Sequence, residues 1–215
     1  MAQIFPEWSN KIPPYILLAV ALLISSVIGF FWYFGSPKYT DVGYQPVQPV
    51  PYSHKLHAGD LGLDCRYCHI GVEVSAFATV PPTQICMNCH TLVKTDSEKL
   101  ERVHESWATG DPIQWVRIHD LPDYVYFNHS AHINAGVGCA SCHGNVAEME
   151  EVIQKKPLSM GWCLDCHRAP EMQLRPGDQV TNMKWEPGED QLAFAKKLMK
   201  EKNINPPVDC SGCHR

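Results

Sequence analysis

All ten cysteines of the chain occur in five Cys-x-x-Cys pairs, and a histidine directly follows each pair. Two thiols at this spacing can add to the two vinyl groups of one porphyrin, while the imidazole of the next residue binds the iron. The sequence therefore predicts five covalently bound haem c groups. The predicted thioether-forming residues are Cys65, Cys68, Cys86, Cys89, Cys139, Cys142, Cys163, Cys166, Cys210 and Cys213, and the predicted proximal iron ligands are His69, His90, His143, His167 and His214.

Other uses of paired cysteines fit the pattern poorly. Cys-x-x-Cys pairs also bind zinc or form redox-active disulfides, but neither use requires a histidine at the next position. Histidine accounts for 11 of 215 residues. Its chance occurrence after all five pairs therefore has a probability on the order of 10^-7.

Four further histidines form two His-x-x-His pairs, each seven or eight residues before a haem-binding cysteine. On a helical turn, positions i and i+3 share a face, so one pair can supply ligands to two neighbouring haems. Solvent-exposed imidazoles would explain neither the pairing nor its duplication. We expect all four to be distal iron ligands: His54, His57, His129 and His132.

The fifth distal ligand has three candidates. His119 lies in an extended stretch that leads into the second His-x-x-His pair, and it is the preferred one. Met160 precedes Cys163 by three residues and would raise the potential of its haem. His104 lies on an expected helix, and remains a third choice. The occupancy of each sixth position decides the function, because a filled iron is an electron carrier whereas an open iron permits catalysis.

The N-terminal stretch 13–35 contains about 23 residues without a charge. A helix of that length can span a bilayer. Aromatic residues lie near its ends, and the run of five aromatics at 30–34 occupies the place where a cleavable signal would have small residues. We expect an uncleaved anchor over 1–35, a Pro-rich linker over 36–51 and a pentahaem cytochrome c domain over 52–215.

Flanking charge barely sets the orientation of this span, since Lys11 and Lys38 lie one on each side. Covalent haem c attachment takes place outside the cytoplasmic membrane. The expected location is therefore the cytoplasmic (inner) membrane, with a single span and the haem domain on the periplasmic or extracytoplasmic side.

Composition also favours a haem protein. About 180 residues beyond the span would hold five porphyrins, which displace side chains from the core, and 17 prolines and 14 glycines are compatible with an irregular chain. The expected fold class is mainly α-helix and irregular coil, with one transmembrane helix and a haem-packed domain. A helix is expected after the capping-box sequence at 95–98, where Leu100, Val103 and Trp107 recur at helical spacing. A second helix is expected over 189–202, with Leu192, Ala195 and Leu198 or Met199 buried. A net charge of −5 gives no basic surface for nucleic acid.

The order of motifs resembles a known family. The pattern His54-x-x-His57 before Cys65 is similar to multihaem cytochromes of the c3/c7 type. The segments 115–129 and 158–168, together with one span and five haem sites, resemble the pentahaem cytochrome family of bacterial alternative complex III, over nearly the whole chain. That resemblance implies an integral-membrane quinol-oxidising subunit and an iron-sulfur subunit as partners. It also implies a soluble cytochrome c, a copper protein or an oxidase as acceptor, in a respiratory or photosynthetic quinol:acceptor oxidoreductase.

Three functions compete at this stage. The first is a non-catalytic electron carrier within such a complex, and we prefer it because one span offers poor walls for a quinol pocket. The second is a stand-alone membrane-anchored multihaem quinol dehydrogenase, although that class usually has four haems and a first site close behind the span. The third is a reductase of nitrite or a similar small molecule, which needs an open iron.

Overall fold

The computed structural model describes residues 4–214, and the chain divides into two compact units, Met1–Val42 and Gly43–Arg215. Within residues 4–214 the structure contains helices and irregular chain but no β-strand. Isolated bridges join Val125 to His214 and Val137 to Leu174. The expected class of mainly α-helix and irregular coil is confirmed.

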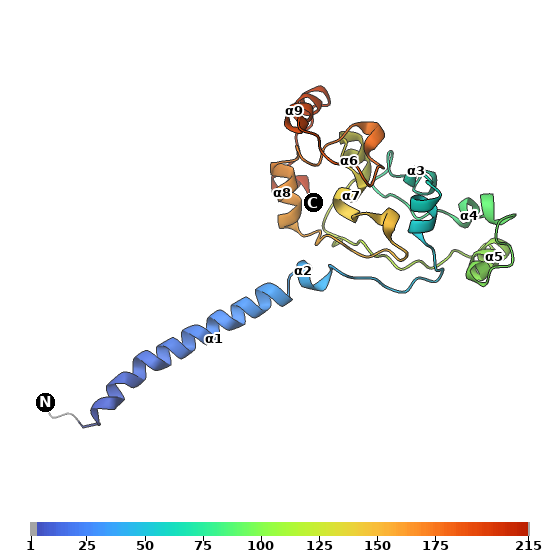
Figure 1. Ribbon diagram of the computed structural model, residues 1–215. Helices are drawn as coiled ribbons and strands as arrows, with labels where there is room; N and C mark the ends of the chain where they lie inside the picture. The colour runs from blue at the N-terminus through green and yellow to red at the C-terminus, as the bar shows by residue number, and fades with distance from the viewer. Residues whose placement is uncertain (1–3, 215) are drawn as a thin grey trace. The chain divides into compact units, whose positions relative to one another are not determined.

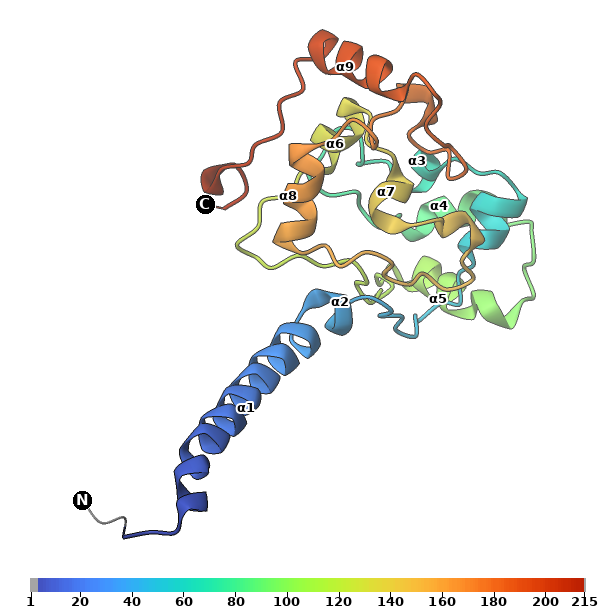
Figure 2. The ribbon, with the colours of Figure 1, turned by 60° about the vertical axis from the view of Figure 1, so that its left-hand side comes forward.

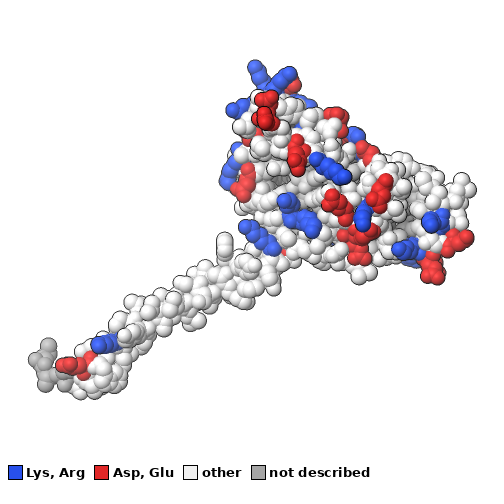
Figure 3. Space-filling view, in the orientation of Figure 1, with Lys and Arg blue, Asp and Glu red and all other residues white. Residues whose placement is uncertain are grey.

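The first unit is dominated by one apolar helix. A 3-10 helix, η1 (Glu7–Lys11), leads into α1 (Ile12–Phe34), which begins with two prolines in its first turn and ends at Gly35; α2 (Pro37–Thr40) follows. Figure 1 shows α1 as one continuous helix, and its surface in Figure 3 is free of charge along its length. Within the segment Glu7–Phe34 an 18-residue stretch has a mean hydropathy of 2.3 and is not buried, so the helix is a candidate membrane span.

The second unit consists of short helices joined by irregular chain, as Figures 1 and 2 show. Its helices are η2 (Lys55–Asp60, a π-helix), α3 (Cys65–Cys68), α4 (Thr83–His90), η3 (Glu98–Leu100), α5 (Glu101–Thr109), α6 (His129–Ala135), α7 (Cys139–His143), η4 (Val146–Glu148), α8 (Met160–Arg168), η5 (Gly177–Gln179), α9 (Gln191–Glu201) and η6 (Cys210–Gly212). The surface in Figure 3 carries both signs of charge, interspersed.

The protein core of this unit is small. Among the described residues the buried apolar side chains are Val50, Met87, Val103, Met149, Leu174, Val180 and Ala195. Three of them form a cluster, to which Leu100 and Trp115 add partly buried surface. A domain of about 170 residues normally buries most of its apolar surface in a continuous core. The sparse side-chain core agrees with an interior built around bound cofactors.

The extended stretch 43–51 is held on the second unit by hydrogen bonds and packing. The N–H of Gly43 donates to the carbonyl of Gln154 over 2.9 Å. The Gln48 amide donates to the carbonyl of Val116 over 2.9 Å and accepts from its N–H over 3.0 Å. Val50 is 4% exposed and belongs to the buried cluster. This part of the expected linker therefore contacts the haem domain along its length.

Candidate functional site

Each Cys-x-x-Cys-His motif lies on or at the end of a short helix. The motifs occupy α3, α4, α7, α8 and η6, and all ten cysteines are free of disulfides. One helical turn places residues i and i+3 on the same face, so both thiols of a motif can approach one porphyrin edge. Three of these helices start with a side-chain cap, in which Asp64, Ser159 and Asp209 accept a backbone N–H.

Four of the five proximal imidazoles are oriented by backbone carbonyls. Their Nδ1 atoms lie at hydrogen-bonding distance from a main-chain oxygen: His69 from Thr79 at 2.8 Å, His90 from Val93 at 2.9 Å, His167 from Pro207 at 2.7 Å and His214 from Tyr124 at 3.1 Å. With Nδ1 as the donor, Nε2 keeps its lone pair for a metal. This arrangement is typical of histidines that serve as metal ligands.

The histidines of the His-x-x-His pairs show the same arrangement. The Nδ1 atoms of His57, His129 and His132 lie 2.8, 2.9 and 2.8 Å from the carbonyls of Ser53, Ala76 and Asn128. Nδ1 of His54, by contrast, is buried with no hydrogen-bond partner among the described residues. Burial lowers the pKa of His54 to about 4, with smaller contributions from His69 and His57. A buried neutral imidazole is a suitable iron ligand.

Three pairs of imidazoles face each other across a gap that fits an iron atom. The ring centres of His57 and His90 are 6.2 Å apart, those of His129 and His143 6.4 Å, and those of His132 and His167 6.1 Å. A metal bound at about 2 Å by the near nitrogen of each ring would hold the two ring centres about 6 Å apart. The donor set therefore fits haem iron with an imidazole on each side.

The two His-x-x-His segments are geometrically equivalent. The ring of Tyr52 lies 4.8 Å from that of His54, edge to face, and 4.4 Å from that of His57, nearly parallel. Phe127 lies 4.7 Å from His129, edge to face, and 4.5 Å from His132, tilted by 32°. The first histidine of the second segment faces the proximal histidine of the first motif that follows it. The same relation in the first segment would pair His54 with His69, whose charge lowers the pKa of His54.

The candidates for the fifth distal ligand are at three different places. The ring of His119 lies 4.3 Å from that of His143, and its Nε2 atom is buried without a hydrogen-bond partner among the described residues. His104, on α5, also has a buried and unpartnered Nε2, whereas Met160 is 67% exposed at the start of α8. The ring contact of His214 within residues 4–214 is with Tyr124, at 5.7 Å. All five distal ligands therefore stay predictions, and for the fifth the three candidates remain.

The His143 imidazole lies among other histidines of the site, at 4.3 Å from the ring of His119 and 6.4 Å from that of His129. Burial lowers its pKa to about 3, with further contributions from His119, His129, His69 and His54. Burial also lowers the pKa of His119. Histidines from both halves of the second unit thus converge on one region, and most of them would be neutral at pH 7.

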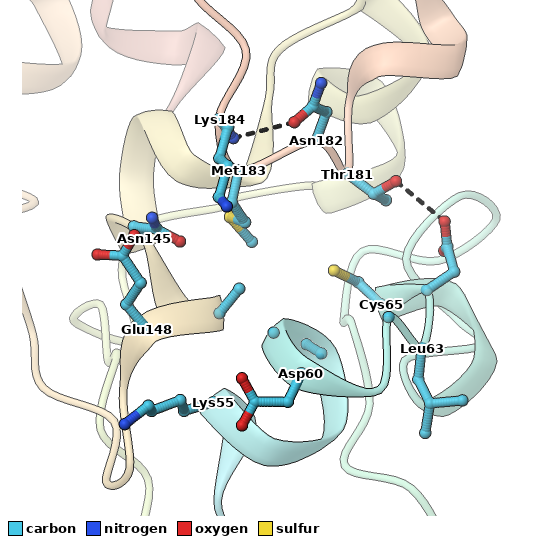
Figure 4. A pocket seen from close by; sticks show the side chains of 15 residues that line it. Lys55, Asp60, Leu63, Cys65, Asn145, Glu148, Thr181, Asn182, Met183 and Lys184 are labelled. Atoms are coloured by element: carbon cyan, nitrogen blue, oxygen red, sulfur yellow. Dashed lines mark hydrogen bonds between the residues drawn. The ribbon is translucent and has the colours of Figure 1, made fainter.

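A cavity of about 410 Å³ lies beside the first motif (Figure 4). The Cys65 sulfur faces it, and polar side chains from other segments line it, among them Asn145, Thr181 and Lys184. The side-chain oxygen of Asn145 is buried without a hydrogen-bond partner among the described residues. A buried polar atom without a protein partner, next to a motif thiol, fits a bound group at this place.

Comparison with known proteins supplies the family. Residues 125–215 match the family described as cytochrome c7 and related cytochrome c. The chain is 30% identical over 169 residues to "Menaquinone reductase, multiheme cytochrome c subunit" of Nitratidesulfovibrio vulgaris, an alignment that covers 69% of this chain and 78% of that protein. The chain belongs to the family of multihaem cytochrome c subunits. Covalently bound haem c is accordingly its cofactor, and electron transport its general function.

Sequence reasoning did not find every residue that organises this multihaem cytochrome. The carbonyl groups of Thr79, Val93, Pro207, Tyr124 and Ala76 orient iron-binding imidazoles. A carbonyl is common to all residues, so side-chain identity carries no signal for this role. Thr79 has a positive φ of 61°, a conformation that the sequence did not predict.

Proposed function

We propose that this chain is a membrane-anchored pentahaem cytochrome c that carries electrons from a quinol-oxidising partner to an extracytoplasmic acceptor. The observation that carries the proposal is the set of facing imidazole pairs, with ring centres 6.1 to 6.4 Å apart. An iron held between two imidazoles has no free position for a substrate. Bound haem supplies one-electron transfer, and the residues of this chain fix its position and exclude other chemistry.

The proposed ligand roles follow the sequence motifs. The ten cysteines form the thioether bonds to five haems, and His69, His90, His143, His167 and His214 bind the irons on the proximal side. His54, His57, His129 and His132 bind four of them on the distal side, and His119 is the proposed fifth, with Met160 and His104 as the competing ligands. The haem domain begins at residue 52 in this proposal, after the anchor (1–35) and the linker (36–51).

The proposed location is the cytoplasmic membrane, with α1 as the single span. The 23 residues of α1 would extend about 35 Å, which exceeds the roughly 30 Å thickness of the hydrocarbon layer. Haem c is attached outside the cytoplasm, so the second unit belongs on the periplasmic or extracytoplasmic side. The proposed partners do not include nucleic acid, because the net charge of the chain is −5.

The proposed partners are an integral-membrane quinol-oxidising subunit and an iron-sulfur subunit, as in alternative complex III. Support comes from the family, since the similar protein of N. vulgaris is named as a subunit of a quinone-linked complex. The proposed acceptor is a soluble cytochrome c, a copper protein or an oxidase. A stand-alone quinol dehydrogenase is the alternative, and it would require a quinol site within this chain.

Electrons could also flow in the opposite direction, toward the quinone. The N. vulgaris protein is named a menaquinone reductase subunit, which favours flow toward the quinone as the competing function. Facing imidazole pairs suit either direction, because an electron carrier is reversible. The direction depends on the potentials of the haems and of the partners.

The test uses the native protein purified in a mild detergent. We expect copurification of a polytopic membrane subunit and an iron-sulfur subunit, and a mass for this chain that includes five haems. Addition of a short-chain quinol should reduce the haems of the complex within seconds, but not those of the isolated chain. Rapid quinol-dependent reduction of the isolated chain would instead establish the quinol dehydrogenase. A complex that reduces quinone but does not oxidise quinol would show that electrons flow in the opposite direction.

A further inference from the structure

The attachment motifs can be numbered 1 to 5 in chain order, and their spatial neighbours can be read from contacts between them. The motifs comprise residues 65–69, 86–90, 139–143, 163–167 and 210–214. Motif 1 contacts motif 2 directly, since the side-chain amide of Asn88 donates to the Tyr67 hydroxyl over 3.0 Å. The His54–His57 turn links the same two motifs, because His57 faces His90 while His54 corresponds to His69.

Motif 1 also contacts motif 3, which is distant in sequence. The N–H of Cys139 donates to the carbonyl of Val180 over 3.0 Å, and the hydroxyl of the next residue, Thr181, donates to Asp64 over 3.0 Å. Asp64 caps the helix that carries Cys65. Two consecutive residues thus hold the first turns of α3 and α7 together.

Motif 3 is next to motif 4. His129 and His132 lie one turn apart on α6, and they face His143 of motif 3 and His167 of motif 4 respectively. Ligands one helical turn apart hold their partners within van der Waals reach of each other. This is the same relation that the first His-x-x-His turn gives to motifs 1 and 2.

Motif 4 is next to motif 5. The Nδ1 atom of His167 lies 2.7 Å from the carbonyl of Pro207, three residues before Cys210. The ring of Pro207 packs on Gly212 so closely that a Cβ at Gly212 would lie 2.4 Å from it. Motif 5 therefore lies on the proximal side of motif 4.

We propose that the five motifs form one unbranched array in the spatial order 2–1–3–4–5, so that motifs 2 and 5 are its two ends and motif 1 is an interior link. The proposal rests on the proposed function as an electron carrier. One further observation agrees with it. Among the ten cysteines the exposed ones are Cys89, in motif 2, and Cys210, in motif 5, whereas the other eight are partly buried.

The order has a consequence for redox partners. Electron tunnelling falls exponentially with distance, so partners must approach the array where it reaches the surface. The two docking regions are then the loop after α4, where Leu92 is 88% exposed, and the segment before η6, where Val208 is 55% exposed. In a simple order 1–2–3–4–5, motif 2 would be interior and a partner at α4 would meet no array end.

The first test substitutes one distal ligand at a time in the full-length haem-loaded protein. His57→Met and His54→Met should each convert one bis-imidazole iron to a His/Met iron, which raises its potential, so that it is reduced before the others. A reduced low-spin iron is diamagnetic, and its magnetic coupling to neighbouring oxidised irons disappears. Low-temperature EPR at that potential should show one perturbed neighbour signal in His57→Met and two in His54→Met.

The order 1–2–3–4–5 predicts the opposite counts, two for His57→Met and one for His54→Met. The proposed array requires one perturbed signal in His57→Met and two in His54→Met. Any other result overturns it. The measurement uses purified chain without quinol or partner. Failure of the proposed partners or direction would therefore leave this result unchanged, and a wrong array would leave the quinol experiment unchanged.

The second test needs no change in the ligands. In the haem-loaded protein all ten cysteines are consumed, so an introduced surface cysteine pair provides the free thiols for gadolinium tags. With the haems reduced, the pulsed dipolar distance between tags at Leu92→Cys and Val208→Cys should exceed that between Leu61→Cys and Val208→Cys, because motif 2 is the far end. A longer distance from Leu61, which precedes motif 1, overturns the order even if the ligand variants fail to fold.

Discussion

At the residue scale, two aromatic rings each contact both imidazoles of a His-x-x-His turn, the proposed distal iron ligands. Phe127 contacts His129 edge to face and His132 at a tilt, and Tyr52 does the same for His54 and His57. Burial raises the pKa of the Tyr52 hydroxyl above its usual value. One ring therefore positions the distal ligands of two haems, and its loss should loosen both.

Phe127→Ala should release His129 and His132 together. Phe127 is only partly buried, so we expect a loss of about 2 kcal/mol, below the roughly 3–5 kcal/mol of Phe→Ala in fully buried cores. In the haem-loaded protein the change should produce a high-spin, carbon-monoxide-binding fraction at two irons, measured by optical difference spectra. Phe127→Tyr, which copies the first segment, should retain fully low-spin irons.

The matched surface control for this prediction is Phe77→Ala. Phe77 is 69% exposed and contacts no imidazole ring among the described residues. The control variant should bind no carbon monoxide and lose little stability. A Phe127→Ala variant whose irons all stay low-spin would mean that the carbonyl hydrogen bonds alone hold the distal ligands.

Some residues of this site can be predicted from the sequence, and others cannot. The haem attachment residues follow from spacing, because covalent chemistry dictates it. The two His-x-x-His turns were also predictable as candidate distal ligands, since helical geometry couples positions i and i+3. The fifth distal ligand was not, because His119, His104 and Met160 have no repeated spacing and only tertiary contacts distinguish them.

At the element scale, the prediction of helices depended on whether local sequence or tertiary packing sets the boundary. The helix expected over 189–202 is observed as α9 (Gln191–Glu201), with Ala195 fully buried. Leu192, expected inside, is 55% exposed. The buried place near the helix start is taken by Gln191, whose amide donates to the carbonyls of Glu171 and Leu174.

The capping box expected at 95–98 does not form. A short 3-10 turn, η3, occupies 98–100 and has no side-chain cap, and α5 begins only at Glu101. Val103 is buried as expected, whereas Trp107 is 51% exposed. The π-helix η2 was not predictable either. Its wide turn follows His54 directly, at a site where the backbone is set by ligand placement rather than by propensity.

Gly136 provides the test at this scale, because it ends α6 where two segments meet. Its φ is +98°, its carbonyl accepts from the Arg175 N–H over 2.8 Å, and a Cβ there would lie 2.5 Å from the Arg175 carbonyl oxygen. Gly136→Ala should cost about 3 kcal/mol, since a left-handed φ costs roughly 1–2 kcal/mol and the clash adds to it. Denaturant unfolding of the haem-loaded protein measures the loss.

Gly110→Ala is the matched control. Gly110 ends α5 with a φ of +81°, but a Cβ there would meet no atom within 4 Å. Only the backbone strain remains, so the expected cost is about 1 kcal/mol. Equal losses in the two variants would show that the contact with Arg175 relaxes at no cost.

At the scale of the whole molecule, the two units differ in how they bury apolar surface. The second unit has few buried side chains of its own and depends on covalently attached groups for its interior. The first unit contains the apolar helix α1, whose most apolar 18-residue stretch is not buried. A helix that exposes this much apolar surface is stable in lipid, not in water. The chain thus separates a candidate membrane span from a domain with little side-chain core of its own.

Replacement of residues 1–35 by a cleavable signal peptide should therefore yield a water-soluble domain with all five haems. The compact unit begins at Gly43, and its contacts with the stretch 43–51 remain intact. We expect the same haem-to-protein ratio and the same EPR spectrum as in the full chain. The full chain should remain in the membrane fraction through an alkaline carbonate wash, whereas the truncated domain should be released in the soluble periplasmic fraction. Retention of the truncated domain on lipid vesicles would mean that the second unit has a membrane-binding surface of its own.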